Sequence, residues 1–590
     1  MALPAGAARA AGTKDWLEVI AADSPLLLIA PHGGRAEPRT RAILHPKVND
    51  LHTAAITREL AARVGASALI NHAMDRNRLD CNRIAQIAES APWLLEMIDE
   101  RLREIVERHG RATILLIHGW NIIEPRVDFG LGLKLLGGEL RPPGAAHVSA
   151  SDEFIRGPLA AFASRLREGG IKPSFGMRYP AGGAQNLLQA FTRRHRESTV
   201  AALRAMAETA DSGTLDALQL EFSVACRMPG PLRERCIDAM ASAFAPSSKI
   251  KNTESGGTPI IRMPRPKLVS PVAKAPPPQP TRVGIELYDP ASRIGAMASF
   301  DLGAGGFGAR IMILLGARRV ALFTGEGRVE RTERGIALGA LKLDQHGESL
   351  KLSFDGAAVI VPDSTEYLSI ERALASGRLD PALRINVELT PFGTPLDLAE
   401  ILVAAKDPAR LATALASFGK IDGEIVVEGD ARALGGHARA GVSFTGLGPA
   451  KFASRRMAWV CFDASTALEM RHTTSDAGDE LRSARVMTDG EWREHELCSL
   501  TLEAPEVESP PHQMEAEIAA ADATKRRIVG NPESFIPLSR PGPDGSRIYT
   551  ALGFATFTMD ERSGSGMFEY SRRASSVMTA DSSEEGDDPD

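Results

Sequence analysis

The first half of the chain alternates short apolar runs with longer amphipathic stretches. Runs of three to five residues that are mainly apolar are typical of buried strands. They cover Leu26 to Ala30, Ser67 to Ile70, Thr113 to Ile117 and Leu218 to Leu220. Between the runs, His52 to Val64 predicts a helix that ends at Gly65, and Leu94, Ile98, Leu102 and Ile105 mark the apolar face of another. We therefore expect an α/β domain over residues 14–246, with helices flanking a mostly parallel sheet.

The pattern changes after residue 246. Residues 247–281 are polar and then proline-rich, which predicts a linker. From 282 to 573, apolar runs recur, several of them about ten residues apart, with turn residues between them, and this spacing predicts a mainly β sandwich or barrel. We expect a helix within Leu396 to Ala416, and a loop with a short charged helix within Glu503 to Asn531.

The end of the chain and its composition add limits. Strands are expected at Arg547 to Met559 and at Met567 to Tyr570, before an acidic tail, 574–590, that we expect to be disordered. A chain of 590 residues with net charge −6 predicts at least two domains and argues against a nucleic-acid partner. We expect no transmembrane helix, since no apolar run is long enough, and no signal peptide from the pattern near Met1. Five cysteines without a CxxC pair favour a reducing, cytoplasmic location.

Three predicted strands end in residues that suit a metal site. The first leads to His32, two glycines that allow a sharp turn, and Glu37; the others lead to His118 and Glu221. Ligands collect beyond the carboxyl ends of strands in open α/β sheets. His32, Glu37 and His118 would form a two-histidine, one-carboxylate zinc site with a position left for water. Glu221 would then move the proton of that water. The alternatives are a solvent-facing pair on a turn for His32 and Glu37, and a capping or ion-pairing role for Glu221.

Two further stretches carry polar groups that suit a site. The run from Asp75 to Arg83 places arginines beside Asn82, and arginines can bind a carboxylate through two hydrogen bonds. A solvated turn with balanced charges is the alternative. Asp50 could support a zinc ligand from behind, but the start of a helix explains an aspartate there equally well.

Together these motifs resemble a known family. Pro31-His32-Gly33-Gly34, Arg76 with Asp80-Cys81-Asn82-Arg83, Ile117-His118-Gly119 and Leu218-Gln219-Leu220-Glu221 resemble N-formylglutamate amidohydrolase and its relatives. The run from His32 to Thr40 is also similar to the HGGxxExGT motif of poly-γ-glutamate hydrolases, and both groups are zinc-carboxypeptidase-like. The resemblance spans Leu26 to Ser223.

This first resemblance implies an activity and roles for residues. It implies zinc on His32, Glu37 and His118, with Glu221 as general base and acid. It implies that Asn82 and Arg83 bind the carboxylate of the substrate, and that Arg76 polarises the scissile carbonyl or holds the substrate. The expected reaction is hydrolysis of an amide in a small carboxylate-bearing molecule, such as an N-acyl-glutamate or a γ-glutamyl compound.

A second, looser resemblance concerns the β-rich half. Gly553 to Tyr570, together with Gly435-Gly436-His437, resembles the lipocalin-like fold of carotenoid hydratase (hydroxyneurosporene synthase) relatives. It implies a barrel that could enclose a hydrophobic ligand, or a scaffold that only packs against the hydrolase. The alternative to an enzyme is therefore a binding protein, whose β domain holds the ligand and whose first domain is a degenerate hydrolase fold.

Overall fold

The fold is taken from a computed structural model of the chain. The structure describes residues 15–36, 47–136, 139–142, 147–245, 280–302, 308–397, 414–444, 452–502, 512–541 and 546–574. These residues form two compact units: the first holds the residues before the segment 246–279 together with the short stretches Gly356–Val359 and Arg378–Pro381, and the second holds the rest of the chain after that segment. The predicted linker and acidic tail lie almost entirely outside the described residues.

A seven-stranded mixed sheet forms the centre of the first unit. Four of its six pairings are parallel, and only β1–β3 and β9–β5 are antiparallel. In spatial order the strands are β1 (Leu17–Ile20), β3 (Ser67–Asn71), β2 (Leu26–Ala30), β4 (Ala112–Trp120), β9 (Leu215–Ser223), β5 (Arg126–Gly130) and β8 (Lys172–Phe175). The strands predicted from apolar runs are confirmed as β2, β3, β4 and β9.

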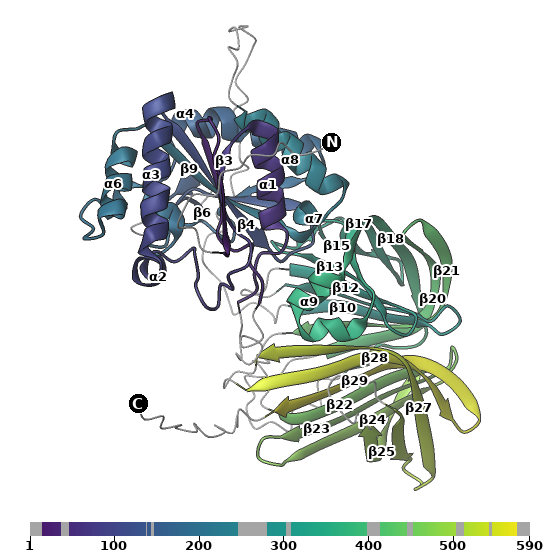
Figure 1. Ribbon diagram of the computed structural model, residues 1–590. Coiled ribbons are helices and arrows are strands. Elements are labelled where there is room, and N and C mark those ends of the chain that lie inside the picture. Colours follow the sequence, from purple (N-terminus) through teal and green to yellow (C-terminus); the bar gives the residue numbers. More distant parts are fainter. Residues whose placement is uncertain are drawn as a thin grey trace, which may run out of the picture. The chain divides into compact units, whose positions relative to one another are not determined.

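Helices cover both faces of this sheet, because successive residues of a buried strand point to opposite sides. Leu26 and Leu28 belong to a core with α1 (Thr53–Val64), α5 (Ala160–Glu168) and α8 (Pro231–Phe244). Leu27 and Ile29 belong to the opposite core with α2 (Ile84–Ser90), α3 (Pro92–His109) and α6 (Ala201–Asp211). Figure 1 shows α3 and α6 on one side of the strands and α1 and α8 on the other.

The two helices predicted in this unit are confirmed. Helix α1 ends at Gly65, whose φ of 65° is one that glycine adopts without strain. Helix α3 buries the predicted face of Leu94, Ile98, Leu102 and Ile105. Short elements complete the unit: the hairpin β6 (Lys134–Leu136) and β7 (Glu139–Arg141), α4 (Asp152–Phe154), and α7 (Val224–Arg227) directly after β9.

The second unit contains two eight-stranded barrels. In the first, the strand order is β13-β12-β11-β10-β21-β20-β18-β17, and a pairing between β17 and β13 closes the ring. Its strands are β10 (Pro280–Asp289), β11 (Ile294–Asp301), β12 (Gly308–Leu315), β13 (Arg319–Gly325), β17 (Ser349–Val361), β18 (Arg378–Pro391), β20 (Ala414–Val427) and β21 (Asp430–Phe444). Beyond β17, the sheet continues through β16 (Leu341–His346), β15 (Gly335–Leu338) and β14 (Glu330–Arg331); the short β19 (Leu396–Asp397) pairs with β20, and α9 spans Ile370–Ser376.

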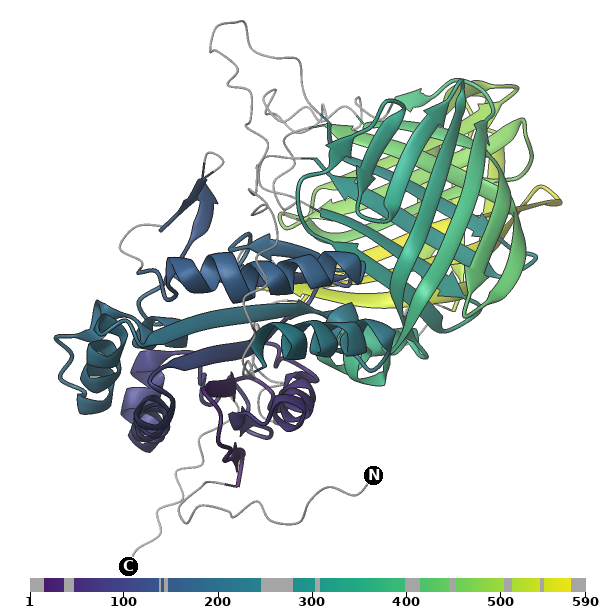
Figure 2. The same cartoon turned by 90° about the horizontal axis from the view of Figure 1, so that it is seen from above.

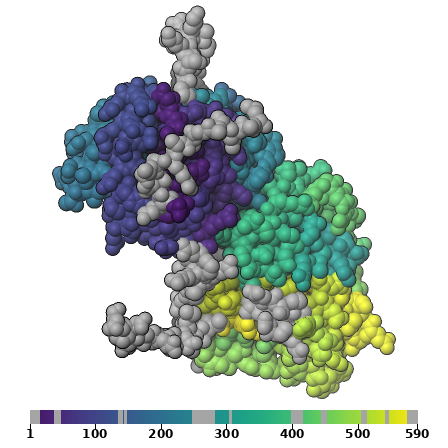
Figure 3. Space-filling model, viewed as in Figure 1, coloured from purple at the N-terminus to yellow at the C-terminus, as the bar shows by residue number. Residues whose placement is uncertain are grey.

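The second barrel is a simple meander in which every strand pairs with the next and the last pairs with the first. This up-and-down order of eight strands is that of lipocalins. Its strands are β22 (Phe452–Cys461), β23 (Thr466–Ser475), β24 (Glu480–Thr488), β25 (Glu491–Leu502), β26 (Met514–Ala519), β27 (Lys525–Pro541), β28 (Arg547–Met559) and β29 (Arg562–Ala574). Buried apolar side chains such as Val460, Met470 and Phe557 form one core. The barrels are the teal-to-green and the green-to-yellow strands of Figure 2, and the same colours mark their surfaces in Figure 3.

The barrel prediction is thus confirmed; of the two helices predicted within it, one is wrong, and the other is wrong at both of its ends and untested between them. Leu396 and Asp397 form β19, and Ala414 begins β20; residues 398–413 lie outside the described part of the chain. The charged helix expected before Asn531 is instead the hairpin of β26 and β27. Met514, Ala516 and Ile518 point inward while Glu515 and Glu517 are more exposed, which is the two-residue period of a strand. Among the described helices, none combines the length and apolar character that a bilayer crossing requires.

Candidate functional site

The candidate site lies at the carboxyl ends of β2, β4 and β9. These strands are parallel neighbours, so their carboxyl ends meet at one edge of the sheet. His32 follows the end of β2, and His118 lies near the end of β4 opposite Glu221 of β9. The structure therefore brings together three strand ends that the sequence picked out separately.

Gly33 and Gly34 hold the backbone of this site in place by close packing. The backbone of neither glycine has a positive φ. A Cβ on Gly33 would lie 2.6 Å from the carbonyl oxygen of Asn71, and one on Gly34 would overlap that of Met74. Glycine is required at these positions because the backbone packs closely against the end of β3 and the loop that follows it. The expected reason, a sharp turn that only glycine can make, does not apply.

His32, Asp50 and His118 form a buried group that we call the His–Asp–His cluster. The Nδ1 atoms of His32 and His118 lie 3.3 and 3.2 Å from the same oxygen, Oδ2 of Asp50. All three side chains are buried, and one potential ligand atom from each lies within 4.8 Å of the others. Zinc bonds of about 2.0–2.2 Å at tetrahedral angles place neighbouring ligand atoms about 3.3–3.5 Å apart. The two short edges of the cluster match that spacing.

Asp80 limits the ways in which the contacts of the cluster can be satisfied. Oδ1 of Asp80 lies 2.6 Å from Nε2 of His32, so it accepts the proton of that nitrogen. A neutral His32 then presents the lone pair of Nδ1 to the carboxylate of Asp50, and two acceptors face each other. A cation between them, or a second proton on His32, removes the conflict. A carboxylate behind a ligating histidine is the usual support of a zinc ligand.

Asp50 is placed by its backbone as well as by its side chain. Its N–H donates to the carbonyl of His32 at 2.8 Å, and its Oδ2 also accepts the N–H of Gly119 at 3.0 Å. Burial raises the pKa of Asp50, but the neighbouring side chains of His118 and His32 outweigh this and hold the pKa well below its usual value. Asp50 is therefore an ionised carboxylate between two imidazoles. These contacts are compatible both with the predicted place behind the histidine ligands and with a place as a ligand itself.

The other predicted ligand and the predicted base have different outcomes. Glu37 lies outside the described residues, so its role as a zinc ligand stays a prediction. Glu221 is buried and accepts a hydrogen bond from Nε2 of Gln219 at 2.7 Å. Burial raises its pKa to about 7, with Asp50 and Asp128 adding to the rise and His118 opposing it. A carboxyl with such a pKa can both take and return a proton near neutral pH.

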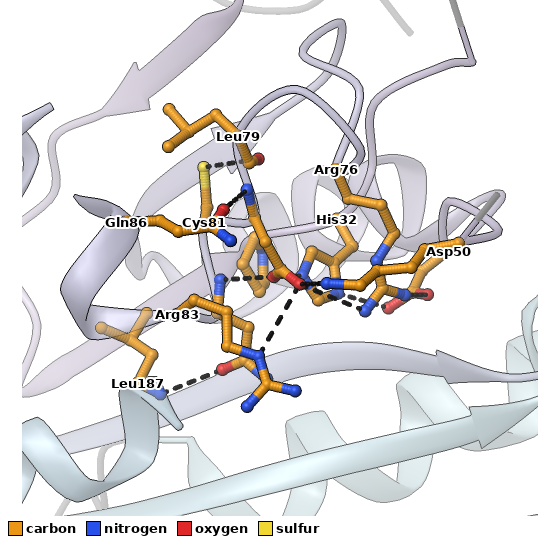
Figure 4. Close-up of polar contacts among 12 residues, drawn as sticks. His32, Asp50, Arg76, Leu79, Cys81, Arg83, Gln86 and Leu187 are labelled. Atoms are coloured by element: carbon orange, nitrogen blue, oxygen red, sulfur yellow. Dashed lines mark hydrogen bonds and ion pairs between the residues drawn. The ribbon is translucent and has the colours of Figure 1, made fainter. Parts of the chain in front are cut away.

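Positive side chains surround Asp80, among them Arg76 and Arg83, which are labelled in Figure 4. Lys47 Nζ lies 2.8 Å from Oδ2 of Asp80, and Arg76 and Arg83 approach the same oxygen at 3.8 and 3.9 Å. Burial raises the pKa of Asp80, but the contact with His32 and these cations lower it more, so the residue stays ionised. Sequence reasoning missed Asp80 and Lys47 as parts of the site.

The predicted substrate-binding residues lie beside this group. Arg83 is about half exposed, so it can reach a ligand in solvent. Asn82 uses its Oδ1 to accept the N–H of Leu187, and Arg76 donates to the carbonyl of Val48 and to Oδ1 of Asp50. Their predicted contacts with a substrate stay predictions. Cys81 is no nucleophile here, because burial raises the pKa of its thiol to about 12.

Comparison with known proteins identifies no family for the chain and finds only distant structural matches. No protein-family model and no curated protein matches the chain. An AttH-type protein from Nitrosomonas europaea matches with 11% identity and a TM-score of 0.32, over 49% of this chain and 90% of that one. CghA with Sch210972 matches with 11% identity and a TM-score of 0.32, over 50% and 88%. Kievitone hydratase from Nectria haematococca matches with 9% identity and a TM-score of 0.28, over 49% and 88%.

TM-scores this low carry no conclusion about function. The lipocalin-like description of the second barrel rests on its own strand pairing. The carboxypeptidase-like assignment of the first unit, and a hydrophobic ligand in a barrel, stay predictions.

Proposed function

We propose that the chain is a zinc-dependent amidohydrolase whose metal is held by His32, Asp50 and His118. The observation that carries this proposal is the shared oxygen of Asp50, which two imidazole nitrogens face at 3.2 and 3.3 Å. Zinc in such a site would lower the pKa of a water molecule and polarise the carbonyl of the substrate. Glu37 would be an additional or alternative ligand.

The residues of the chain would divide the remaining work. Glu221 takes a proton from the attacking water and returns it to the leaving amine nitrogen, for which a pKa of about 7 is suited. Asp80 fixes the tautomer of His32 so that Nδ1 faces the cluster. The exposed guanidinium of Arg83 supplies a positive charge for the carboxylate of an N-acyl-glutamate or γ-glutamyl substrate.

Metal analysis of the purified full chain tests the proposal. We expect about one zinc per chain, and hydrolysis of N-acyl amino acids or γ-glutamyl peptides. Both the zinc and the hydrolysis should be lost in the variants His32→Ala, Asp50→Ala and His118→Ala. His109→Ala is the matched control, because His109 lies at the carboxyl end of α3 and pairs with Asp23. Glu37→Ala shows whether Glu37 shares the metal.

The possible outcomes separate the two functions. Zinc that stays bound in the His32 and His118 variants would refute the ligand assignment. A wild-type chain that binds no divalent metal would favour the alternative, a binding protein with a degenerate hydrolase fold.

A further inference from the structure

Arg227 is a buried arginine that the motifs did not single out. It ends α7, the short helix that follows β9, and it is 1% exposed. Its Nη2 donates to Oδ1 of Asn121. Its Nη1 is buried and has no hydrogen-bond partner among the residues that the structure describes.

Gly119 places this guanidinium against the site. A Cβ on Gly119 would overlap Nη1 of Arg227 and would lie 3.1 Å from Cβ of Asp50. Gly119 follows His118 directly, and its N–H donates to Asp50. Arg227 therefore occupies the space that a side chain beside His118 would fill, and its free donor lies close to the His–Asp–His cluster.

Leaving this donor unpaired is costly. A buried N–H without an acceptor destabilises the folded protein, and more so when it belongs to a charged group. Burial lowers the pKa of the Arg227 guanidinium, while Asp50 and Glu221 favour its charged form. No carboxylate in the described part of the chain lies within ion-pair distance of it. A buried cation with a free N–H beside a candidate metal site can donate a hydrogen bond to an oxygen atom of a bound substrate.

We propose that Nη1 of Arg227 donates to the oxygen of the scissile carbonyl and stabilises the negative charge that develops there; this rests on the proposed function. The water oxygen adds to the carbonyl carbon, the π electron pair moves onto the carbonyl oxygen beside Arg227, and the water proton goes to Glu221. The electron pair of the oxyanion then re-forms the C=O bond, the C–N pair leaves with the nitrogen, and the proton on Glu221 passes to that amine nitrogen. Arg76, which resemblance suggested for this role, already donates to Val48 and Asp50.

The position of Arg227 favours the carbonyl oxygen over a remote carboxylate. Its donor lies next to Asp50, so it reaches atoms held at the cluster, whereas the exposed Arg83 approaches Asp80 instead. Donors aimed at a developing oxyanion act on the turnover number more than on substrate binding. Loss of the Arg227 donor should therefore lower kcat more than it raises KM.

The test compares Arg227→Met with Arg233→Met in the zinc-loaded full chain. Arg233 is also a buried arginine, but it belongs to α8 and pairs with Glu59. We expect Arg227→Met to keep its zinc, to lose about 10²–10³-fold in kcat with KM changed only a few-fold, and to bind inorganic phosphate at least about tenfold more weakly by calorimetry. Arg233→Met should keep both properties.

A second variant guards against misfolding of the first. Gly119→Ala retains Arg227 but pushes its guanidinium aside, and it should lower kcat in the same way. Unchanged kcat and phosphate binding in Arg227→Met, or loss of zinc from it, would overturn the role of Arg227 while the zinc hydrolase stands. A wild-type chain without metal overturns both.

Discussion

Each unit of this protein has a buried or partly buried cluster of charged and polar side chains, and the two clusters differ in whether their hydrogen-bonding atoms all have partners. The barrel unit has what we call the barrel cluster, made of Glu286, Arg439, Trp459, Glu469 and Arg471. Arg439 lies 3.1 Å from Glu469 and 3.4 Å from Glu286, Trp459 donates to Glu286 at 2.8 Å, and Arg471 donates to Glu469 at 2.7 Å. None of the polar atoms of these five described residues is buried without a partner.

The strand-end site of the first unit, by comparison, contains buried polar atoms that have no hydrogen-bond partner in the described structure. Nε2 of His118, Nη1 of Arg227 and Nε of Arg76 are all buried without partners in the described structure. A satisfied network of charges fixes one arrangement of two barrels, here joining β10 and β21 to β22 and β23. Buried polar atoms without partners instead call for an explanation, and a missing ligand is one such explanation.

The largest expected effect comes from Glu221→Gln. This change should keep the zinc but lower kcat by about 10²–10⁴-fold, because the amide cannot accept the proton of water. Stability should not fall, since burial already disfavours the charged carboxylate. Metal analysis, turnover and thermal unfolding check it, with the exposed Glu208→Gln as control. Near-normal turnover would mean that Glu221 takes no part in the reaction, and it would weaken the contrast between a functional strand-end site and a structural barrel cluster.

Arg439→Met should have the opposite profile. Removing the cation deprives buried Glu469 of one of its two arginines, while Arg471 still pairs with it. The unfolding free energy should therefore fall, but by less than the cost of about 3–5 kcal/mol for a fully uncompensated buried charge. Zinc content and turnover should not change. Denaturant unfolding measures the loss, and Arg432→Met on the same strand is the control, because its exposed pair with Asp430 contributes at most about 1 kcal/mol. Equal stabilities of the two variants would contradict a structural role for the barrel cluster.

Asp80→Asn tests the support behind His32. The amide can still hydrogen-bond Nε2 but no longer favours the neutral tautomer with the same strength, so zinc affinity should fall about 10–100-fold. Competition with a chelator of known affinity measures this. Asp211→Asn, which alters an exposed pair with Arg196, should leave the affinity unchanged. An unaltered affinity in Asp80→Asn would mean that Asp80 serves Lys47 rather than the metal site.

The smallest effect concerns acid stability. Burial raises the pKa of Glu469, but Arg439 and Arg471 lower it further, so its pKa lies below the unfolded value of 4.5. The stability that this carboxylate contributes is present above pH 4.5 and is lost as the pH falls through the lower pKa of the folded protein. Glu469→Gln should therefore unfold with a shallower pH dependence below pH 4.5. Denaturant unfolding at a series of acidic pH values measures the slope, and equal slopes for both proteins would argue against this ion pair.

Much of the fold follows from local pattern. Runs such as Leu26 to Ala30 predict their strands because both faces are buried, and the periodic apolar residues of α3 predict that helix. The hairpin β26–β27 was missed because its charged residues suggested a helix. Their alternation with Met514, Ala516 and Ile518 was the available signal.

The site could be predicted only where it lies on strand ends. His32 and His118 follow apolar runs, so their convergence could be expected from sheet topology. Asp50 comes from the loop before α1, and Arg227 from a short helix, and no pattern in either segment shows which way its side chain points. Both are placed by tertiary contacts, through the carbonyl of His32 and the missing side chain of Gly119.

The His–Asp–His cluster joins residues separated by 18 and 68 positions along the chain. Closing loops of that length for the sake of one ion is unfavourable in an unfolded polypeptide, and here the apolar sheet core closes them without help. A chelator should thus yield an intact but empty protein, unlike a zinc finger, which unfolds when its metal is withdrawn. Uptake of zinc would then report that the chain has already reached its native state.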